Sequence, residues 1–531
     1  MSSVTTIQTP PHPTPPVTFV GIGPGDADLL TVRGARLLAR AALVVADRPL
    51  DAALRRLVAP EAEVVEDAAE RPPAEVAKSL AAAARSGRLA VRLLPGDPFV
   101  GARGPQEVEA LTKSGLTWEI VPGIPSALAV AGCAGVPLLT ARHPEVGLAC
   151  ATEDADWRAL ASGPRTLALE SAIAEVGKLA ARLVEHGRPG DSPVAVTCGG
   201  ATTSQQTVVS TLDAAETDVA NAGLSGDCVV VIGDAVRQRD KLSWFETRPL
   251  FGWRVLVPRT KDQAGTLSEQ LRSYGAVPVE VPTIAVEPPR SPAQMERAVR
   301  GLVSGRYQWV VFTSQNAVRA IRERFEEYGL DARAFAGVKV AAVGEQTARR
   351  LVEFGVMPEL VPSGEQTSEG LVADFPPYDD IFDPINRVLL PRADIATETL
   401  VSGLTELGWE CEDVTAYRTV RAAPPPAEIR DAIKSGGFDA VLFTSASTVR
   451  NLVGIAGKPH TSTVIAVIGP ATEAAAEEQG LRVDVRAARA SVAALAEALA
   501  EHGRAVRQAA IEAGEWTGRP GRPKPAKTRR R

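Results

Sequence analysis

Short apolar runs alternate with amphipathic stretches along most of the chain. Runs rich in Val, Leu and Ile predict strands over residues 17–20, 42–46, 89–94 and 118–121. Between them, stretches rich in Ala, Leu and Arg predict helices over residues 31–41 and 73–86. A helix followed by a strand appears again between residues 173 and 232. This alternation is typical of parallel α/β units.

An internal repeat occupies the second half of the chain. The matching segments are residues 254–259 with 387–392, 309–319 with 440–450, and 343–348 with 468–473. Each copy reads as a strand, a Thr-Ser pair and a helix, in the same order. We therefore expect an α/β protein whose second half forms two similar lobes, with a ligand in the cleft between them.

The composition of the 531 residues agrees with several packed lobes. Hydrophobic residues make up 45% and charged residues 23%, which is ordinary for globular proteins. The net charge of -6 gives no general signal for nucleic-acid binding, so we expect no such partner. Predicted domains cover residues 17–250 and 251–502. They are flanked by a disordered Pro/Thr-rich leader (1–16) and a basic Pro-rich tail (503–531), which is read as a solvated end or as an anchor to an acidic partner.

Metal and disulfide chemistry have no visible basis in the sequence. The five cysteines lie far apart without a C-x-x-C pair, and the five histidines are equally scattered. No metal site is predicted. The N-terminus lacks the pattern of a signal peptide, and the apolar runs are too short to span a bilayer. These features predict a cytoplasmic protein without a membrane partner.

A glycine-rich turn, Gly21-Ile22-Gly23-Pro24-Gly25-Asp26, follows the first predicted strand. Such a turn lets a ligand approach backbone N–H groups. An NAD-dependent oxidoreductase is one interpretation, with Asp47 as the ribose-binding acid. The dinucleotide fingerprint, however, needs glycine where Asp26 stands, and Pro24 is foreign to it.

The wider set of motifs resembles the uroporphyrinogen-III C-methyltransferases of the tetrapyrrole methylase family, over residues 17 to about 250. The matching segments are 20–26, 29–31, 45–48, 96–100, 103–104, 121–124, 134–138 and 241–246. The resemblance implies two α/β lobes that hold S-adenosylmethionine in their cleft. It also implies methyl transfer to two pyrrole carbons of uroporphyrinogen III, which gives precorrin-2.

The same resemblance implies roles for individual residues. Asp47 would be the base that removes the displaced proton, and Arg103 would pair with a substrate carboxylate. The cofactor site would be lined by Pro24, Gly96, Asp97, Val100, Ser126 and Gly199. Structural alternatives stand beside these roles, because Asp26 can be a helix N-cap and Asp97-Pro98 an ordinary turn.

Several positions depart from the family pattern where chemistry is expected. They are Pro95, Pro125 and Ser171 in cofactor-contacting segments, Gln106, the Thr140-Ala141-Arg142 segment, and residues 66–69, where an active-site lysine has no counterpart. Pro95 removes a backbone N–H that could reach the cofactor. A methylase-like half that only binds or scaffolds tetrapyrroles is therefore kept as an alternative.

The duplicated half resembles uroporphyrinogen-III synthase. Its landmarks are segments 257–259, 312–314, 343–347, 391–392, 416–419, 443–445 and 468–472. The resemblance implies cyclisation of hydroxymethylbilane with inversion of one ring, without a cofactor. Because the substrate's own pyrroles drive the reaction, the protein mainly has to impose a conformation.

Hydrogen-bond donors at the starts of helices can hold the linear substrate in one conformation. The predicted substrate-binding residues are Thr313, Ser314, Gly344, Thr347, Arg392, Thr444, Ser445, Gly469 and Thr472. For the Thr and Ser residues, plain N-capping is the competing interpretation. By family position Tyr417 would orient or protonate the leaving hydroxyl, unless it only packs at the lobe interface.

Together these features predict a bifunctional enzyme of tetrapyrrole biosynthesis. The expected partners are small-molecule tetrapyrroles, and a homodimer through the methylase half is possible by family analogy. The sequence does not distinguish the sirohaem branch from the cobalamin branch.

Overall fold

The computed structural model describes residues 17–101, 103–163, 165–259, 265–394, 398–514 and 521, so the predicted leader lies outside the described residues. The described residues form two compact units. The first contains the chain up to residue 255 together with 269–278 and the residues from 496 onward. The second contains residues 256–268 and 279–495.

The first lobe of the first unit is a parallel sheet in the order β3-β2-β4-β1-β5. Its strands are β1 (Val17–Gly21), β2 (Leu43–Val45), β3 (Glu63–Val65), β4 (Ala90–Leu94) and β5 (Trp118–Val121). The four predicted strands are confirmed, and β3 was not expected. Every residue of β1 and β4 is buried, as expected for a parallel sheet covered on both faces.

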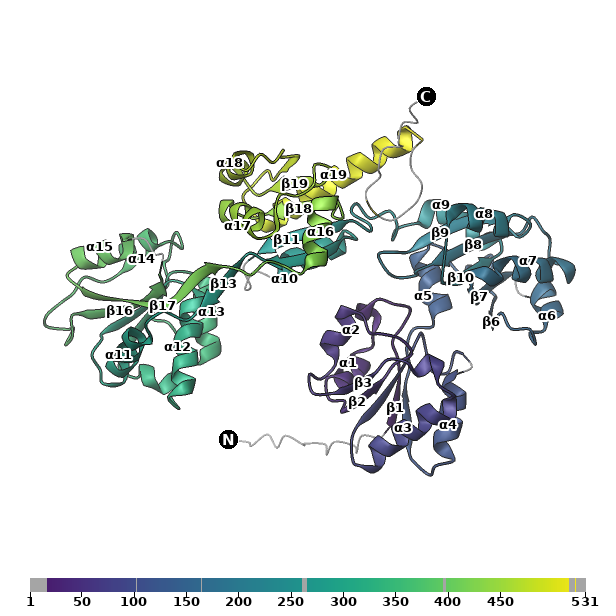
Figure 1. Cartoon of the computed structure of the whole chain (residues 1–531), viewed down its shortest axis with the longest axis horizontal. Helices are drawn as coiled ribbons and strands as arrows, with labels where there is room; N and C mark the ends of the chain where they lie inside the picture. Colours follow the sequence, from purple (N-terminus) through teal and green to yellow (C-terminus); the bar gives the residue numbers. More distant parts are fainter. Residues whose placement is uncertain are drawn as a thin grey trace. The chain divides into compact units, whose positions relative to one another are not determined.

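Helices cover both faces of this sheet (Figure 1). They are α1 (Val32–Leu38), α2 (Ala52–Leu57), α3 (Pro73–Arg85) and α4 (Arg103–Thr112). The first two pack with Val20 and Val44 in one core, and the last two pack with Phe19 and Val45 in another. The helices predicted over 31–41 and 73–86 are confirmed as α1 and α3. Consequently the carboxyl ends of the parallel strands form a common edge, where loops can build a site.

The second lobe carries a mixed sheet in the order β6-β7-β10-β8-β9. Its strands are β6 (Val146–Cys150), β7 (Thr166–Ala172), β8 (Pro193–Cys198), β9 (Gln206–Thr211) and β10 (Asp227–Ile232). Its helices are α5 (Ser126–Cys133), α6 (Trp157–Ser162), α7 (Val176–Glu185), α8 (Ala215–Ala222) and α9 (Arg239–Leu242). Only the pairing of β6 with β7 is parallel. The expectation of parallel units over 173–232 was therefore wrong, because the short link from β8 to β9 has no room for a crossover helix.

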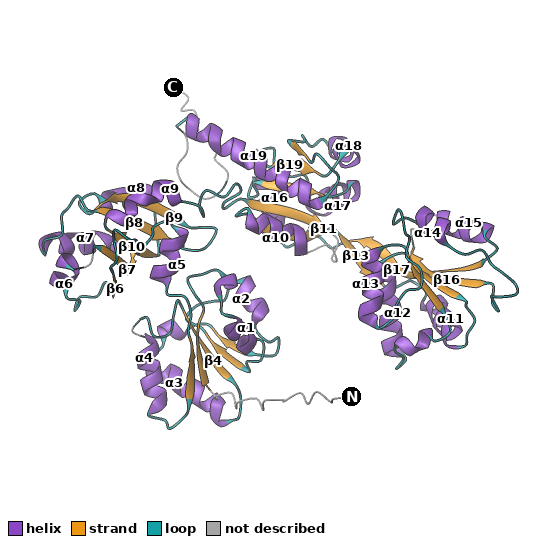
Figure 2. Cartoon of the chain, turned by 180° about the vertical axis from the view of Figure 1, so that it is seen from behind, coloured by secondary structure: helices purple, strands orange, loops and turns teal. Residues whose placement is uncertain are grey.

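Two further sheets lie mainly in the second unit, and some of their strands are labelled in Figure 2. Their strand orders are β13-β17-β16-β14-β15 and β12-β11-β18-β19-β20. The first combines β13 (Ile284–Glu287), β14 (Trp309–Phe312), β15 (Lys339–Ala342), β16 (Arg387–Ala393) and β17 (Glu410–Arg421). The second combines β11 (Arg254–Arg259), β12 (Val277–Pro282), β18 (Ala440–Phe443), β19 (Val464–Val467) and β20 (Val485–Arg486). Matching strands of the two repeat copies lie on different sheets, but each copy is divided between both sheets. The first copy places β14 on one sheet and β11 on the other, and the second copy places β16 and β18 in the reverse way.

The repeat is preserved in the helices that follow its strands. They are α10 (Gly265–Ser273), α11 (Pro292–Val303), α12 (Gln315–Glu327), α13 (Glu345–Phe354), α14 (Ser368–Asp374), α15 (Thr399–Glu406), α16 (Ala427–Ser435), α17 (Ala446–Ala456) and α18 (Pro470–Glu478). Strand β14 leads through Ser314 into α12, and β18 leads through Ser445 into α17. Both serines cap their helices with the side-chain oxygen, so the capping interpretation of these two residues is confirmed.

The chain ends in helix α19 (Val492–Glu512), and the expected start of a tail at residue 503 was wrong. Apolar residues such as Leu499 and Ala510 are buried on this helix, and Arg507 donates hydrogen bonds to the carbonyls of Glu246 and Thr247. The basic residues and prolines that defined the predicted tail are concentrated from Arg519 onward. Apart from residue 521, that segment lies outside the described residues. None of the helices that the structure describes has both the length and the apolar character needed to cross a bilayer.

The loops after β1, β4 and β5 approach one another too closely for side chains. A Cβ on Gly123 would lie 2.1 Å from the carbonyl oxygen of Gly96 and 2.8 Å from the Cα of Gly21. We expect Gly123→Ala to lower the free energy of unfolding of this lobe by about 2 kcal/mol or more, because backbone must shift. Calorimetry of the full chain should show one transition at lower temperature. Gly132→Ala, on α5 with open space around its Cβ, is the control and should not lower it.

Candidate active sites

A cavity of about 700 Å³ lies within the first unit, a size typical of small-molecule sites. It is lined by the β1 turn, the segment after β2, the start of α5 and the ends of β7, β8 and β10. Four sequence-predicted residues line it: Pro24, Asp47, Ser126 and Gly199. The fold therefore brings together residues that lie far apart in the sequence.

Two other predicted cofactor residues shape the adjoining loop. Gly96 forms a backbone bridge with Gly23 and has a positive φ of 61°. A Cβ there would lie 3.2 Å from the backbone nitrogen of Ser126, which explains the need for glycine. Asp97 accepts hydrogen bonds from the N–H groups of Phe99 (2.8 Å) and Gly123 (2.9 Å). The turn interpretation of Asp97 thus has direct structural support, while neither residue lines the cavity.

Val100, the remaining predicted cofactor residue, does not line the cavity either. Its side chain is exposed.

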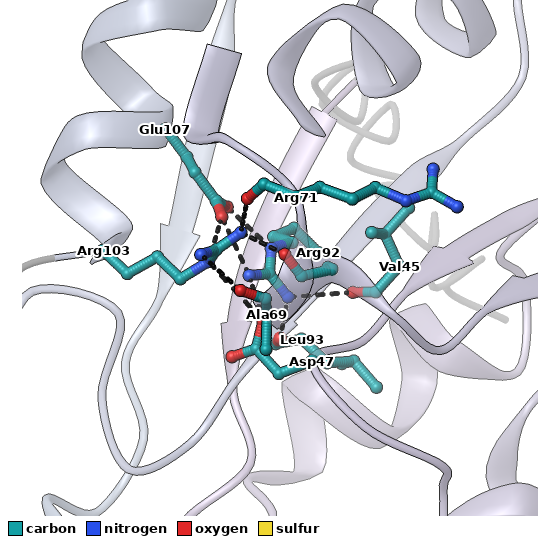
Figure 3. Close-up of polar contacts among 9 residues, drawn as sticks. Val45, Asp47, Ala69, Arg71, Arg92, Leu93, Arg103 and Glu107 are labelled. Atoms are coloured by element: carbon teal, nitrogen blue, oxygen red, sulfur yellow. Dashed lines mark hydrogen bonds and ion pairs between the residues drawn. The ribbon is translucent and has the colours of Figure 1, made fainter. Parts of the chain in front are cut away.

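A buried ion network holds Asp47 at the cavity wall (Figure 3). At its centre is Arg92 on β4, which is 0% exposed. Its Nη2 donates to Asp47 Oδ1 at 2.6 Å and to Glu107 Oε1 at 2.9 Å, and its Nε donates to Glu107 Oε2 at 2.6 Å. Glu107, on α4, is also 0% exposed. Asp47 keeps 15% of its side chain exposed, so it is the network's contact with the cavity.

Arg103 completes this network from the start of α4. Its Nε lies 2.7 Å from Glu107 Oε1 and 3.6 Å from Asp47 Oδ1. Its Nη2 donates to the carbonyls of Ala68 and Arg71. The sequence-predicted carboxylate binder is therefore held by its own chain in this structure.

The electrostatics of Arg92 favour a permanently charged network. Burial alone would lower the pKa of Arg92, but the hydrogen bonds and charges of Glu107 and Asp47 together raise it above its ordinary value. Such charge-assisted bonds are strong because little solvent screens them. The guanidinium therefore stays charged at any accessible pH, and it fixes the orientation of the Asp47 carboxylate.

Further carboxylates line the same cavity. Glu170 and Asp227 stand on β7 and β10, and Asp51 caps α2. Burial raises the pKa of Glu170, while a hydrogen bond from the N–H of Ala127 (3.2 Å) lowers it and the nearby charge of Asp227 raises it. Sequence reasoning missed Arg92, Glu107, Glu170 and Asp227. A charged residue inside an apolar strand was the available signal for Arg92 and Glu170.

A second cavity, of about 650 Å³, lies within the second unit. It is lined by residues 282–289, one side of α12, the start of α13 and the middle of β17. The fold brings three sequence-predicted residues to it: Ser314, Thr347 and Tyr417. The hydroxyls of Ser314 and Tyr417 lie 2.9 Å apart, and Ser314 Oγ also accepts from the N–H of Ala317 at 3.2 Å. Because that capping bond engages one lone pair, the pair of hydroxyls has a defined geometry.

The other predicted substrate-binding residues lie elsewhere. Thr313 and Gly344 directly precede Ser314 and α13 but do not line the cavity. The remaining four lie at the starts of α17 and α18, which follow strands of the other sheet: Thr444, Ser445, Gly469 and Thr472.

Arg392 is almost fully buried against Asp413. Its Nε donates to Asp413 Oδ1 at 2.7 Å, and its Nη2 donates to Oδ2. The hydrogen bond to Asp413 raises the pKa of Arg392 above its ordinary value. The side chain of Arg259, its counterpart in the repeat, lies outside the described residues.

Comparison with known proteins decides the family. The protein-family model described as "Tetrapyrrole (Corrin/Porphyrin) Methylases" matches residues 16–216. The family model described as "Uroporphyrinogen-III synthase HemD" matches residues 265–497. The "Porphyrin biosynthesis protein HemD" of Ruminiclostridium josui is 30% identical over 486 residues, which cover 88% of this chain and 94% of that protein. This chain belongs to the family that joins a tetrapyrrole methylase to a uroporphyrinogen-III synthase. It is a bifunctional enzyme of tetrapyrrole biosynthesis.

Two further relatives match the methylase half. The "Uroporphyrinogen-III C-methyltransferase" of Bacillus subtilis is 34% identical over 244 residues, or 44% of this chain and 95% of that enzyme. The "Siroheme synthase" of Methylococcus capsulatus is 34% identical over 244 residues, or 44% of this chain and 52% of that protein. The chain thus spans about half the length of the siroheme synthase.

Several residues that depart from the methylase pattern lie in or next to the methylase cavity. Pro95 and Ser171 both line the methylase cavity, and Pro125 immediately precedes α5. Glu66, in the region without the family lysine, accepts hydrogen bonds from the N–H of Leu50 and from Arg55. Pro95 and Ser171 therefore form part of the cavity wall, whereas Glu66 contacts that wall through Leu50.

The ion network generates a stability prediction. We expect Glu107→Gln to lower the free energy of unfolding of the methylase half by about 3 kcal/mol, because it leaves the buried Arg92 short of one negative charge. Chemical denaturation of the full chain measures this loss. Glu109→Gln, on the same helix but exposed and paired with Lys113, is the matched control and should leave the transition unchanged. Equal effects of the two substitutions would contradict the account.

Proposed function

We propose that the synthase half converts hydroxymethylbilane into uroporphyrinogen III and that the methylase half methylates this product with S-adenosylmethionine to give precorrin-2. The observation that carries the methylase part is the Asp47 carboxylate, oriented by the buried Arg92 at the wall of the cavity. Family membership and the matching motifs support both reactions.

The methylase cavity suits S-adenosylmethionine in size and in charge. The sulfonium and amino groups of S-adenosylmethionine are cationic, and the carboxylates of Glu170 and Asp227 line the cavity. Hydroxyls of Ser126, Thr197 and Thr202 provide hydrogen-bond partners for polar groups of the cofactor. When bound, the cofactor supplies an electrophilic methyl group. Pro24 and Gly199 would shape the walls around it.

Asp47 would remove the proton from the methylated carbon. The described contacts from Arg92 and Arg103 both go to Oδ1, which leaves Oδ2 to accept that proton. The fixed orientation lowers the entropy that a free carboxylate would lose on reaching the transition state. Arg103 would pair with a substrate carboxylate after releasing the carbonyls of Ala68 and Arg71.

In the synthase half, Tyr417 and Ser314 would act together on the substrate. Tyr417 would donate a hydrogen bond toward the leaving hydroxyl, and Ser314, 2.9 Å away, would hold the phenol in place. Thr347 and Arg319, which line the same cavity, would contact the rest of the folded substrate. Conformational control of the linear substrate is then the main catalytic contribution.

A scaffolding methylase half is the second candidate function. Ser171 and Pro95 in the cavity wall favour it, as do the acidic side chains there, which repel a polycarboxylate substrate. Binding of S-adenosylmethionine by calorimetry separates the two candidates, because a pure scaffold does not need the cofactor. The cytoplasmic location and the homodimer stay predictions.

Asp47→Asn tests the proposed base. We expect methyl transfer to uroporphyrinogen III to fall by about 10²- to 10⁴-fold, since an amide cannot accept the proton. Binding of S-adenosylmethionine and formation of uroporphyrinogen III should remain. Product analysis by chromatography measures both reactions in one sample. Asp67→Asn, on an exposed carboxylate paired with Arg71, is the control and should keep both activities.

Tyr417→Phe tests the synthase site. We expect the rate of uroporphyrinogen III formation to fall by about 10²-fold, because the hydrogen bond toward the leaving hydroxyl is lost. Methylation of added uroporphyrinogen III should be unaffected. The matched control is Tyr328→Phe, at the exposed end of α12. A full rate in Tyr417→Phe would show that the phenol only packs.

A further inference from the structure

Glu170 is a carboxylate inside a strand that is otherwise apolar at this point. It follows Leu167, Ala168 and Leu169 on β7, all of which are fully buried. The side chain is half-buried and lines the methylase cavity beside Ser171. Its Oε1 accepts a hydrogen bond from the N–H of Ala127, in the first turn of α5, at 3.2 Å. The carboxylate is thus held in a fixed position against the cavity.

The charge of Glu170 is not balanced by a cationic side chain among the described residues. The interactions that act on it are burial, the N–H of Ala127 and the like charge of Asp227. Two other acidic residues of the cavity are engaged differently, whereas Asp227 is exposed at the start of β10. Asp47 pairs with Arg92, and Asp51 accepts from the N–H groups of Ala53 and Leu54. A partly desolvated anion of this kind is expensive unless a cation approaches it.

The two forms of the proposed cofactor differ in one charge at the sulfur. S-Adenosylmethionine carries a sulfonium, whereas S-adenosylhomocysteine carries a neutral thioether, and both keep the cationic amino group. In the proposed transfer the methyl carbon would bond to the pyrrole carbon as its bond to sulfur breaks, and the electron pair would stay on sulfur. Asp47 would then accept the proton displaced from the pyrrole carbon. A carboxylate near the sulfur therefore stabilises the reactant cofactor but not the product.

We propose that Glu170 is a specificity-determining residue that distinguishes S-adenosylmethionine from S-adenosylhomocysteine by the sulfonium charge; this inference rests on the proposed function of the methylase half. The fixed carboxylate favours capture of the charged methyl donor. After transfer the same carboxylate faces a neutral sulfur, so the spent cofactor is released more readily. Easier release of the spent cofactor reduces product inhibition. The cost is that the carboxylate stabilises the bound reactant, which raises the barrier to methyl transfer.

The test is calorimetric binding of three probes to the full-length wild type and to Glu170→Gln. The probes are S-adenosylmethionine, its amine analogue sinefungin, which is also cationic at the reacting position, and neutral S-adenosylhomocysteine. We expect Glu170→Gln to weaken both cationic probes by about tenfold and the neutral probe by less than about twofold. The glutamine keeps an oxygen that can accept from Ala127, so the fold of the strand is preserved.

Glu175→Gln is the matched control, because Glu175 lies on the same stretch of chain but pairs with Lys178 on the surface. It should leave all three affinities unchanged. Equal weakening of the three probes by Glu170→Gln would overturn the proposal, since Glu170 would then contact the shared amino group or only shape the cavity. No change in any affinity would overturn it as well. Failure of the wild type to bind any probe would instead refute the proposed methylase function.

Discussion

Neutralisation of Arg92 determines the geometry of the methylase site. A guanidinium with no exposed surface must be paired, and the structure pairs it with Asp47 on one side and Glu107 on the other. These partners come from the end of β2 and from α4, so the charge of one strand residue links a second strand and a helix. The position of the proposed base thus follows from the requirement to satisfy a buried charge. Arg103 joins the same network through Glu107.

The synthase half is organised by neutral groups instead. Its cavity is defined by two hydroxyls, Ser314 and Tyr417, and one of them also caps a helix. Capping fixes the serine, and the serine in turn fixes the phenol. An arrangement of this kind suits a reaction whose chemistry is supplied by the substrate and whose outcome depends on conformation. The two halves therefore use different physics for consecutive steps.

Much of the fold could be predicted from the sequence because local signals are strong. The apolar runs placed β1, β2, β4 and β5, and the Thr-Ser pairs placed the starts of α12 and α17. Asp47 could be connected to a site through its position in the family motif, and the structure places it two residues after the end of β2. The continuation of α19 past residue 502 was missed, because its buried anchors depend on packing partners distant in sequence.

Long-range pairing explains what could not be predicted. Nothing local shows that Arg392 meets Asp413, or that Thr444 and Thr472 follow strands of a different sheet from the strand that precedes Ser314. Likewise a single Glu170 in an apolar strand reads as an ordinary partly exposed residue until the strand is seen to border a cavity. The antiparallel order of the second lobe depends on the short link between β8 and β9, whereas hydrophobic periodicity is the same for both strand directions.

The most direct test of the bifunctional account supplies the purified full-length protein with hydroxymethylbilane and methyl-labelled S-adenosylmethionine. The identity of the tetrapyrrole isomer and the number of labelled methyl groups are then measured by mass spectrometry. The account predicts a product of the type III isomer that carries two labelled methyl groups. Accumulation of unlabelled uroporphyrinogen III in the presence of the cofactor would contradict it.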